Sequence, residues 1–79
     1  MKVKVQLFAT LSLYLPRGVE NRTATLDLPE GASVAEAFRV LRLPDDLPKL
    51  ILLNGINVKE DARLKEGDVL SVFPPIAGG

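Results

Sequence analysis

Residues 33–42, SVAEAFRVLR, decide which fold this sequence can form, because they contain its clearest helix. Ser33 precedes Glu36 by three positions, the spacing of a capping box in which each side chain satisfies a backbone N–H group of the other residue. Apolar side chains then recur at i, i+3, i+4 and i+7 and make one stripe, formed by Val34, Ala37, Phe38 and Leu41. Pro44 cannot continue a helix. The sequence therefore predicts one amphipathic helix over residues 34–42.

Two strands are predicted before this helix. Residues 2–8 and 23–28 alternate polar and apolar side chains, so each strand has one apolar face. The inward side chains are Val3, Val5, Leu7, Ala24, Leu26 and Leu28. Between the two strands, residues 9–21 are expected to form a short helical turn followed by a loop.

Three more strands are predicted after the helix. Residues 50–53 are all apolar, as expected for a strand covered on both faces. Asn54-Gly55 then favours a tight type I′ turn into a short strand over residues 56–58. Residues 69–73 form the last strand, with Leu70 and Val72 pointing inward.

The order of these elements predicts an α+β protein with a ubiquitin-like β-grasp fold. One helix must cover one face of a mixed sheet of four to five strands, because the sequence offers nothing else to cover it. In this fold the first and last strands lie side by side and parallel at the centre of the sheet. We expect a single domain over residues 1–74 and an extended, flexible tail over residues 75–79.

The composition allows one core and excludes several classes of function. A chain of 79 residues that is 47% hydrophobic can form one small domain. Ten basic residues balance ten acidic ones without a run of more than two, so neither a nucleic-acid nor a membrane partner is indicated. No apolar stretch has the length of a signal peptide or a membrane span, so a cytoplasmic location is expected.

Catalysis by the chain alone is not expected. The sequence has no His and no Cys, so it lacks the usual acid–base switch, the strongest side-chain nucleophile and the common zinc ligands. It has no glycine-rich phosphate loop. The carboxylates of Asp45-Asp46 and Glu60-Asp61 lie in polar, turn-like stretches, where solvated turn residues are favoured over a catalytic pair. We expect neither a stably bound cofactor nor a metal.

The ending of the sequence contains its one unusual reactive group. Gly78-Gly79 places a carboxylate on a thread without side chains, which can enter a channel too narrow for a residue with a Cβ atom. The fixed φ angles of Pro74 and Pro75 hold this thread away from the preceding domain. A frayed terminus is the alternative interpretation. The Gly79 carboxylate is the candidate reactive group.

Two aromatic residues are predicted beside this tail. Phe8 and Phe73 have the opposite parity to the inward residues of their strands, so both point away from the helix. If those strands are parallel neighbours, the two rings meet where the tail departs. An aromatic patch left in water usually marks a binding surface. The alternative is that the loop over residues 9–21 folds over the rings.

Several motifs resemble those of the MoaD/ThiS sulfur-carrier family. The ending VFPPIAGG (residues 72–79) is similar to that of the small subunit of molybdopterin synthase, as is LFATL (7–11). LNG (53–55) and LKEGD (64–68) match the wider family. The motifs follow the family's order along essentially the whole chain, and the two prolines resemble the molybdopterin branch more than the thiamine branch. SLYLP (12–16) departs from the charged helix of better-known members.

The resemblance implies that the chain carries sulfur for other enzymes. An adenylating (E1-like) enzyme would use ATP and Mg²⁺ to activate the carboxylate of Gly79. A persulfide sulfur donor would then displace AMP and leave a thiocarboxylate. Its sulfur would pass to a molybdopterin precursor in a larger (MoaE-like) synthase subunit. Gly78 and Gly79 would give the tail reach and narrowness, and the implied partner-binding residues are Phe8, Phe73, Pro74, Pro75, Ile76 and Ala77.

Three other interpretations stay open at this point. The chain could carry sulfur for another product, such as thiamine, an amino acid or a tungsten cofactor. It could be a protein modifier whose Gly79 forms an isopeptide bond with a lysine of a target protein. It could also be a plain β-grasp interaction domain in which the diglycine has no role.

Overall fold

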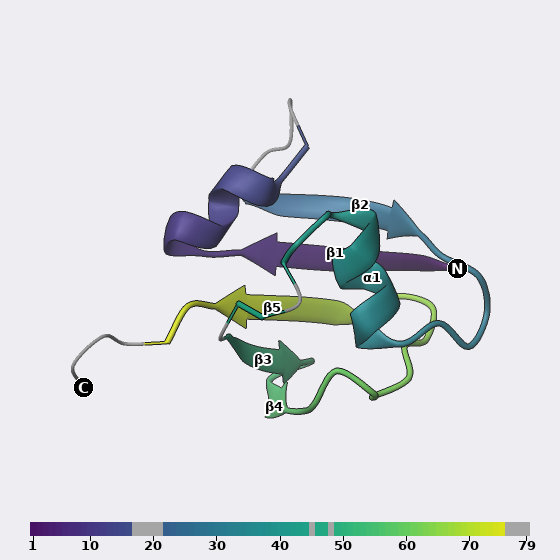
Figure 1. Ribbon diagram of the computed structural model, residues 1–79. Helices are drawn as coiled ribbons and strands as arrows, with labels where there is room; N and C mark the ends of the chain where they lie inside the picture. Colours follow the sequence, from purple (N-terminus) through teal and green to yellow (C-terminus); the bar gives the residue numbers. More distant parts are fainter. Residues whose placement is uncertain (17–21, 45, 48, 76–79) are drawn as a thin grey trace.

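The computed structural model describes residues 1–16, 22–44, 46–47 and 49–75. They form a mixed sheet of five strands in the order β2-β1-β5-β3-β4 (Figure 1). The strands are β1 (Lys2–Leu7), β2 (Thr23–Asp27), β3 (Leu50–Leu53), β4 (Ile56–Asn57) and β5 (Val69–Phe73). β1 and β5 are parallel neighbours at the centre, and the other neighbouring pairs are antiparallel. The predicted ubiquitin-like β-grasp fold is therefore confirmed.

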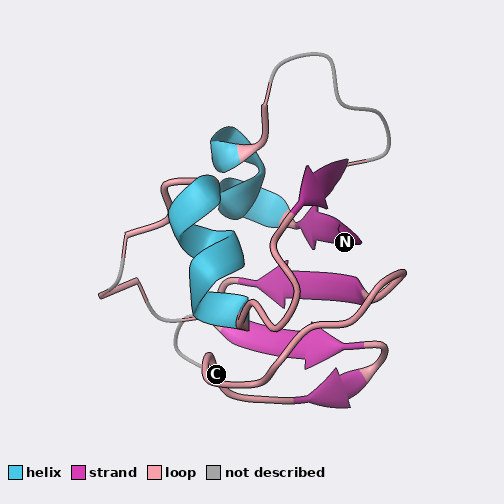
Figure 2. Ribbon diagram, turned by 90° about the vertical axis from the view of Figure 1, so that its right-hand side faces the viewer, coloured by secondary structure: helices cyan, strands magenta, loops and turns pink. Residues whose placement is uncertain are grey.

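Both helical elements lie on one side of this sheet. α1 (Val34–Val40) packs across it, and the 3₁₀ helix η1 (Ala9–Tyr14), the predicted helical turn, lies on the same side (Figure 2). The core lies between these helical elements and the sheet. It contains the inward residues of the strands, the apolar stripe of α1 and Leu11 of η1. Its largest fully buried side chains are Leu7, Leu11, Leu70, Val3, Val5, Val34 and Val72. The opposite side of the sheet, termed the open face below, has no helix within the described residues.

The ends of α1 show why the helix is shorter than predicted. At its start, the Ser33 hydroxyl accepts a hydrogen bond from the Glu36 backbone N–H at 3.4 Å, which confirms the serine half of the predicted capping box. Between these two described residues, the returning bond from the Ser33 N–H to the Glu36 side chain is not formed. At its end, Arg42 has a left-handed φ of 61°. The N–H of Arg42 bonds to the Arg39 carbonyl, and that of Leu43 bonds to the Phe38 carbonyl. This is the Schellman pattern, which ends the helix at Val40 with an arginine where a glycine is usual.

The two turn motifs of the family resemblance contact each other. Asn54 and Gly55 both have positive φ, as the predicted type I′ turn requires. The Asn54 side chain donates to an Asp68 carboxylate oxygen at 3.0 Å and accepts from the Val69 N–H at 2.9 Å. The other Asp68 carboxylate oxygen accepts from the Lys65 N–H at 2.8 Å. These motifs therefore connect the β3–β4 turn to the start of β5, which is a structural role.

The expectation that residues 50–53 are covered on both faces is wrong. Ile51 is buried beneath the helical layer, but Leu50 is 42% exposed and Leu52 is only half-buried. The register pairs Leu50 with Phe73 and Leu52 with Ser71, so both leucines lie on the open face. Because both helical elements lie on the other side of the sheet, no described helix covers them.

Candidate protein-docking site

β1 and β5 bring two aromatic residues together at their C-terminal ends. Both strands run in the same direction and end at the same side of the molecule (Figure 1). Leu7 pairs with Val72, and the Phe8 N–H donates to the Val72 carbonyl at 3.1 Å. The next residues along the chain are Phe8 and Phe73, whose rings stack with centroids 4.3 Å apart and planes 6° from parallel. The predicted meeting of these two rings is confirmed.

Strand parity places this ring pair on the open face. Leu7 and Val72 are completely buried in the core, so the residue that follows each of them points to the opposite side. Both rings are half-buried. Within the described residues, the segment after β1 packs on the core side, because Leu11 is buried there and Tyr14 and Leu15 pack against the same core. These residues do not support the alternative in which residues 9–21 fold over the rings, and residues 17–21 lie outside the described part of the chain.

Two leucines that sequence reasoning missed extend the ring pair. Leu50 is the register partner of Phe73, and Leu52 lies two residues further along β3 on the same face. We term Phe8, Phe73, Leu50 and Leu52 the apolar corner. The sequence does not show that these two leucines are exposed, because residues 50–53 are all apolar and do not alternate with polar residues. Only the pairing of β3 with β5 shows which of them face solvent.

Apart from the half-buried Val69, the remainder of the open face is polar. A short hydrogen-bonded row crosses three strands, in which Ser71 donates to the Gln6 side-chain oxygen and the Gln6 amide donates to Thr23. Lys2 lies 3.6 Å from the carboxylate of its cross-strand neighbour Asp27. The open face therefore has an apolar end, where β1 and β5 finish, and a polar end, where they begin.

The tail begins directly at the apolar corner. Pro74 is half-buried and Pro75 is exposed. Ile76, Ala77, Gly78 and Gly79 lie outside the described residues, so the predicted extended tail and its reactive carboxylate are untested. What the structure adds is the place from which the tail starts, next to the stacked rings.

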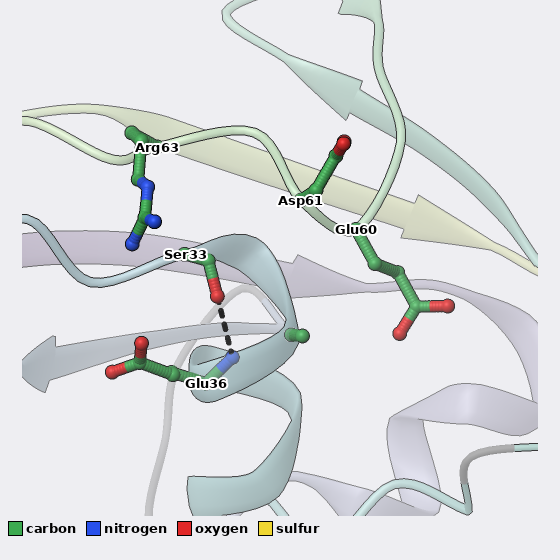
Figure 3. A pocket seen from close by; sticks show the side chains of 6 residues that line it. Ser33, Glu36, Glu60, Asp61 and Arg63 are labelled. Carbon is green, nitrogen blue, oxygen red and sulfur yellow. Dashed lines mark hydrogen bonds between the residues drawn. The ribbon is translucent and has the colours of Figure 1, made fainter.

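A hollow lies between the start of α1 and the segment before β5 (Figure 3). Its volume is about 400 Å³, and its lining residues are Ser33, Ala35, Glu36, Glu60, Asp61 and Arg63. Its polar groups hold the fold together: Ser33 caps α1, and Arg63 donates to the Gly31 carbonyl at 2.8 Å. The carboxylates of Glu36, Glu60 and Asp61 point in different directions in Figure 3. Within the described residues, no group of three potential ligands could hold a metal ion.

Comparison with known protein families shows which family the chain belongs to. The family model of the ThiS family matches residues 5–79. The chain belongs to the ThiS family. A search of curated proteins found no match.

Solved structures that resemble this ThiS-family chain cover it almost entirely. SAMP1 from Haloferax volcanii is 26% identical with a TM-score of 0.77, and the match covers 100% of both chains. A protein named as molybdopterin converting factor, subunit 1, from Pyrococcus furiosus is 32% identical with a TM-score of 0.74, and the match covers 95% of this chain and 98% of that one. ThiS from Geobacter metallireducens, 18% identical with a TM-score of 0.60 and covering 96% and 99%, shares the fold.

These comparisons give the general class of this ThiS-family chain. It is a member of a group of small ubiquitin-fold proteins that includes sulfur carriers and protein modifiers. No helix among the described residues combines the length and apolar character needed to cross a membrane.

Proposed function

We propose that this chain is a sulfur carrier that works through the carboxylate of Gly79. In the first step the carboxylate attacks ATP, pyrophosphate leaves, and an acyl adenylate forms. In the second step the terminal sulfur of a persulfide attacks the acyl carbon and releases AMP. A thiol then cleaves the resulting acyl disulfide and leaves a thiocarboxylate on Gly79. The adenylating (E1-like) enzyme would bind the ATP and Mg²⁺, and the carrier would hold no cofactor of its own.

The observation that supports this proposal best is the position of the apolar corner. The stacked rings of Phe8 and Phe73 lie on the open face at the end of β5, directly before Pro74. Aromatic side chains at the centre of an interface are frequent hot spots. A partner that binds the rings would therefore lie next to the start of the tail, which would be directed into its active site.

The chemistry of the chain agrees with a carrier that other enzymes act on. A carboxylate is a poor electrophile, and the mixed anhydride with AMP supplies the leaving group that it lacks. The sequence has no His or Cys to activate or attack an acyl group. We therefore propose a non-catalytic subunit, whose catalytic groups come from its partners.

The molybdopterin branch is the pathway that we propose. The relative from Pyrococcus furiosus, at 32% identity over 95% of this chain, is named as a subunit 1 of a molybdopterin converting factor. A subunit 1 implies a second subunit, which would be the larger, MoaE-like synthase partner that receives the thiocarboxylate. The Phe73-Pro74-Pro75 ending agrees with the same branch.

Protein modification is the second candidate. Its support is the likeness to SAMP1 from Haloferax volcanii, which is 26% identical over the whole of both chains, and a further structure names that protein as small archaeal modifier protein 1. In this case the acyl adenylate would pass to a lysine amine, and Gly79 would end in an isopeptide bond.

Intact-mass measurement of the protein from its native cells tests both candidates. A carrier shows a fraction whose mass has increased by the difference between sulfur and oxygen, and that shift disappears when Gly79 is deleted. A modifier instead shows high-mass conjugates that resist denaturation. The proposal is contradicted if neither species is found in cells that need the pathway for growth and grow normally. It is also contradicted if the mature chain continues beyond Gly79.

A further inference from the structure

The open face carries one positive charge that nothing in the described residues neutralises. Lys4 is exposed and points to the open face, between Thr25 on β2 and Val69 on β5. Lys2, two residues earlier, lies 3.6 Å from the Asp27 carboxylate. For the Lys4 ammonium, the described residues provide neither an ion pair nor a hydrogen bond. The charged side chains that the strands place on this face, Lys2, Lys4 and Asp27, therefore sum to one positive charge.

Lys4 lies within reach of a partner that covers the apolar corner. Phe8 lies four positions after Lys4, a distance of about 13 Å along an extended chain. A stable protein interface buries about 800 Å² on each partner, which corresponds to a circle with a radius of about 16 Å. The four side chains of the apolar corner cannot fill such an area alone. A footprint centred on the ring pair therefore extends over the polar row and includes Lys4.

A carboxylate is the partner group that best complements the charge of Lys4. An ammonium group that loses water without a partner is costly, and a pair between opposite charges at the edge of an interface fixes its orientation and speeds association. The ring pair alone leaves the partner free to rotate about it. A carboxylate against Lys4 removes this freedom, because the two contacts together define a line along β1.

We propose that the adenylating enzyme binds the open face by two contacts: an apolar pocket for the rings of Phe8 and Phe73, and an acidic side chain that pairs with Lys4. The pairing orients the carrier so that β5 points its C-terminal end toward the active site. This inference rests on the proposed function, since the partner is the enzyme that would activate Gly79.

Pyrophosphate release by the purified adenylating enzyme of the same organism tests the proposal. The rate is measured with ATP and Mg²⁺ as a function of carrier concentration for the wild type, Lys4→Gln, Lys4→Glu and Lys59→Glu. Lys59 is the matched control, because it is exposed and follows β4 outside the strands of the open face. Lys59→Glu changes the net charge by the same amount as Lys4→Glu, so it reports the general effect of charge.

A surface ion pair contributes about 0.2–1 kcal/mol, so KM is expected to rise up to about fivefold for Lys4→Gln. The reversed charge in Lys4→Glu is expected to raise KM about tenfold. In both variants kcat stays at the wild-type value, and Lys59→Glu has little effect. The difference between wild type and Lys4→Glu is expected to shrink as salt is added, because ions screen exposed charges. The midpoint of thermal unfolding confirms that each variant is folded.

One result would overturn the proposed contact at Lys4, and another would overturn the proposed function. If the wild type is activated and Lys4→Glu has the same KM as Lys59→Glu, the acidic contact does not exist, although the carrier function stands. If the wild type releases no pyrophosphate with its own adenylating enzyme, the proposed function itself fails.

Discussion

Phe73 and Leu70 lie on the same strand and face opposite sides of the sheet, so they separate binding from stability at the level of single residues. Leu70 is completely buried, and Phe73 is half-buried and stacks on Phe8. The Phe73→Ala variant is expected to weaken binding of the adenylating enzyme by about 2 kcal/mol or more. The stacking that it loses contributes only about 0.5–1.5 kcal/mol to the fold.

The matched variant is Leu70→Ala, which removes core volume and is expected to lower the free energy of unfolding by about 2–5 kcal/mol. Urea titration measures stability, and calorimetry with the purified adenylating enzyme measures affinity. If Phe73→Ala destabilises the chain as much as Leu70→Ala and leaves the affinity unchanged, Phe73 is a core residue and the docking surface is wrong.

Gly79→Leu tests whether the reactive end has to be narrow. A leucine adds a branched side chain to a thread that we expect to enter a tight channel, so adenylation is expected to fall below detection. The fold is expected to be unaffected, because no described core residue depends on position 79. The measurement is pyrophosphate release with ATP and the adenylating enzyme, with Gly79→Ala as an intermediate step in size. Full adenylation of Gly79→Leu would count against the channel.

At the level of elements, the end of α1 offers a stabilising change. Arg42 has a φ of 61° in the Schellman pattern, and a left-handed conformation costs a residue with a Cβ atom about 1–2 kcal/mol. Glycine avoids this strain but loses about 0.5–1 kcal/mol more backbone entropy. Arg42→Gly is therefore expected to raise the free energy of unfolding by roughly 0.5–1 kcal/mol.

Arg39→Gly provides the matched control for this prediction. It removes the same charge from the same turn, but position 39 is inside the helix, where glycine costs about 1 kcal/mol. The two variants are therefore expected to change stability in opposite directions in a thermal or urea titration. Equal destabilisation by both would show that Arg42 is not strained in solution.

The elements differ in how far their sequence predicts them. β1 and β2 alternate polar and apolar residues strictly, and Ser71 fixes the parity of β5, so their inward residues and the meeting of Phe8 and Phe73 followed from parity. The end of α1 did not, because Arg42 occupies a position that a glycine would have marked. Leu50 and Leu52 were also missed, because an all-apolar strand contains no information about which face stays open. That information lies in the register with β5, which depends on contacts between distant parts of the chain.

The whole molecule separates into a part that folds and a part that we propose reacts. The buried core identified in the described residues runs from Val3 to Val72. The hydrogen bonds of Asn54 and Asp68 tie the β3–β4 turn to the start of β5, at the polar end of the open face. The family motifs at residues 53–55 and 64–68 thus serve the domain, whereas the motifs at residues 7–11 and 72–79 combine the core residues Leu7, Leu11 and Val72 with the rings and the tail. A change in one part is therefore expected to leave the other part intact.

A chain that ends at Pro75 tests this separation. Removal of residues 76–79 takes no side chain from the described core, so the free energy of unfolding is expected to change by less than about 0.5 kcal/mol. Adenylation is expected to be lost, because the new carboxylate is up to about 13 Å short of the site that the full tail reaches. Urea titration and pyrophosphate release measure the two effects on the same sample. A loss of about 2 kcal/mol or more would mean that the last four residues pack on the domain, and an end that packs there cannot enter the active site of a partner.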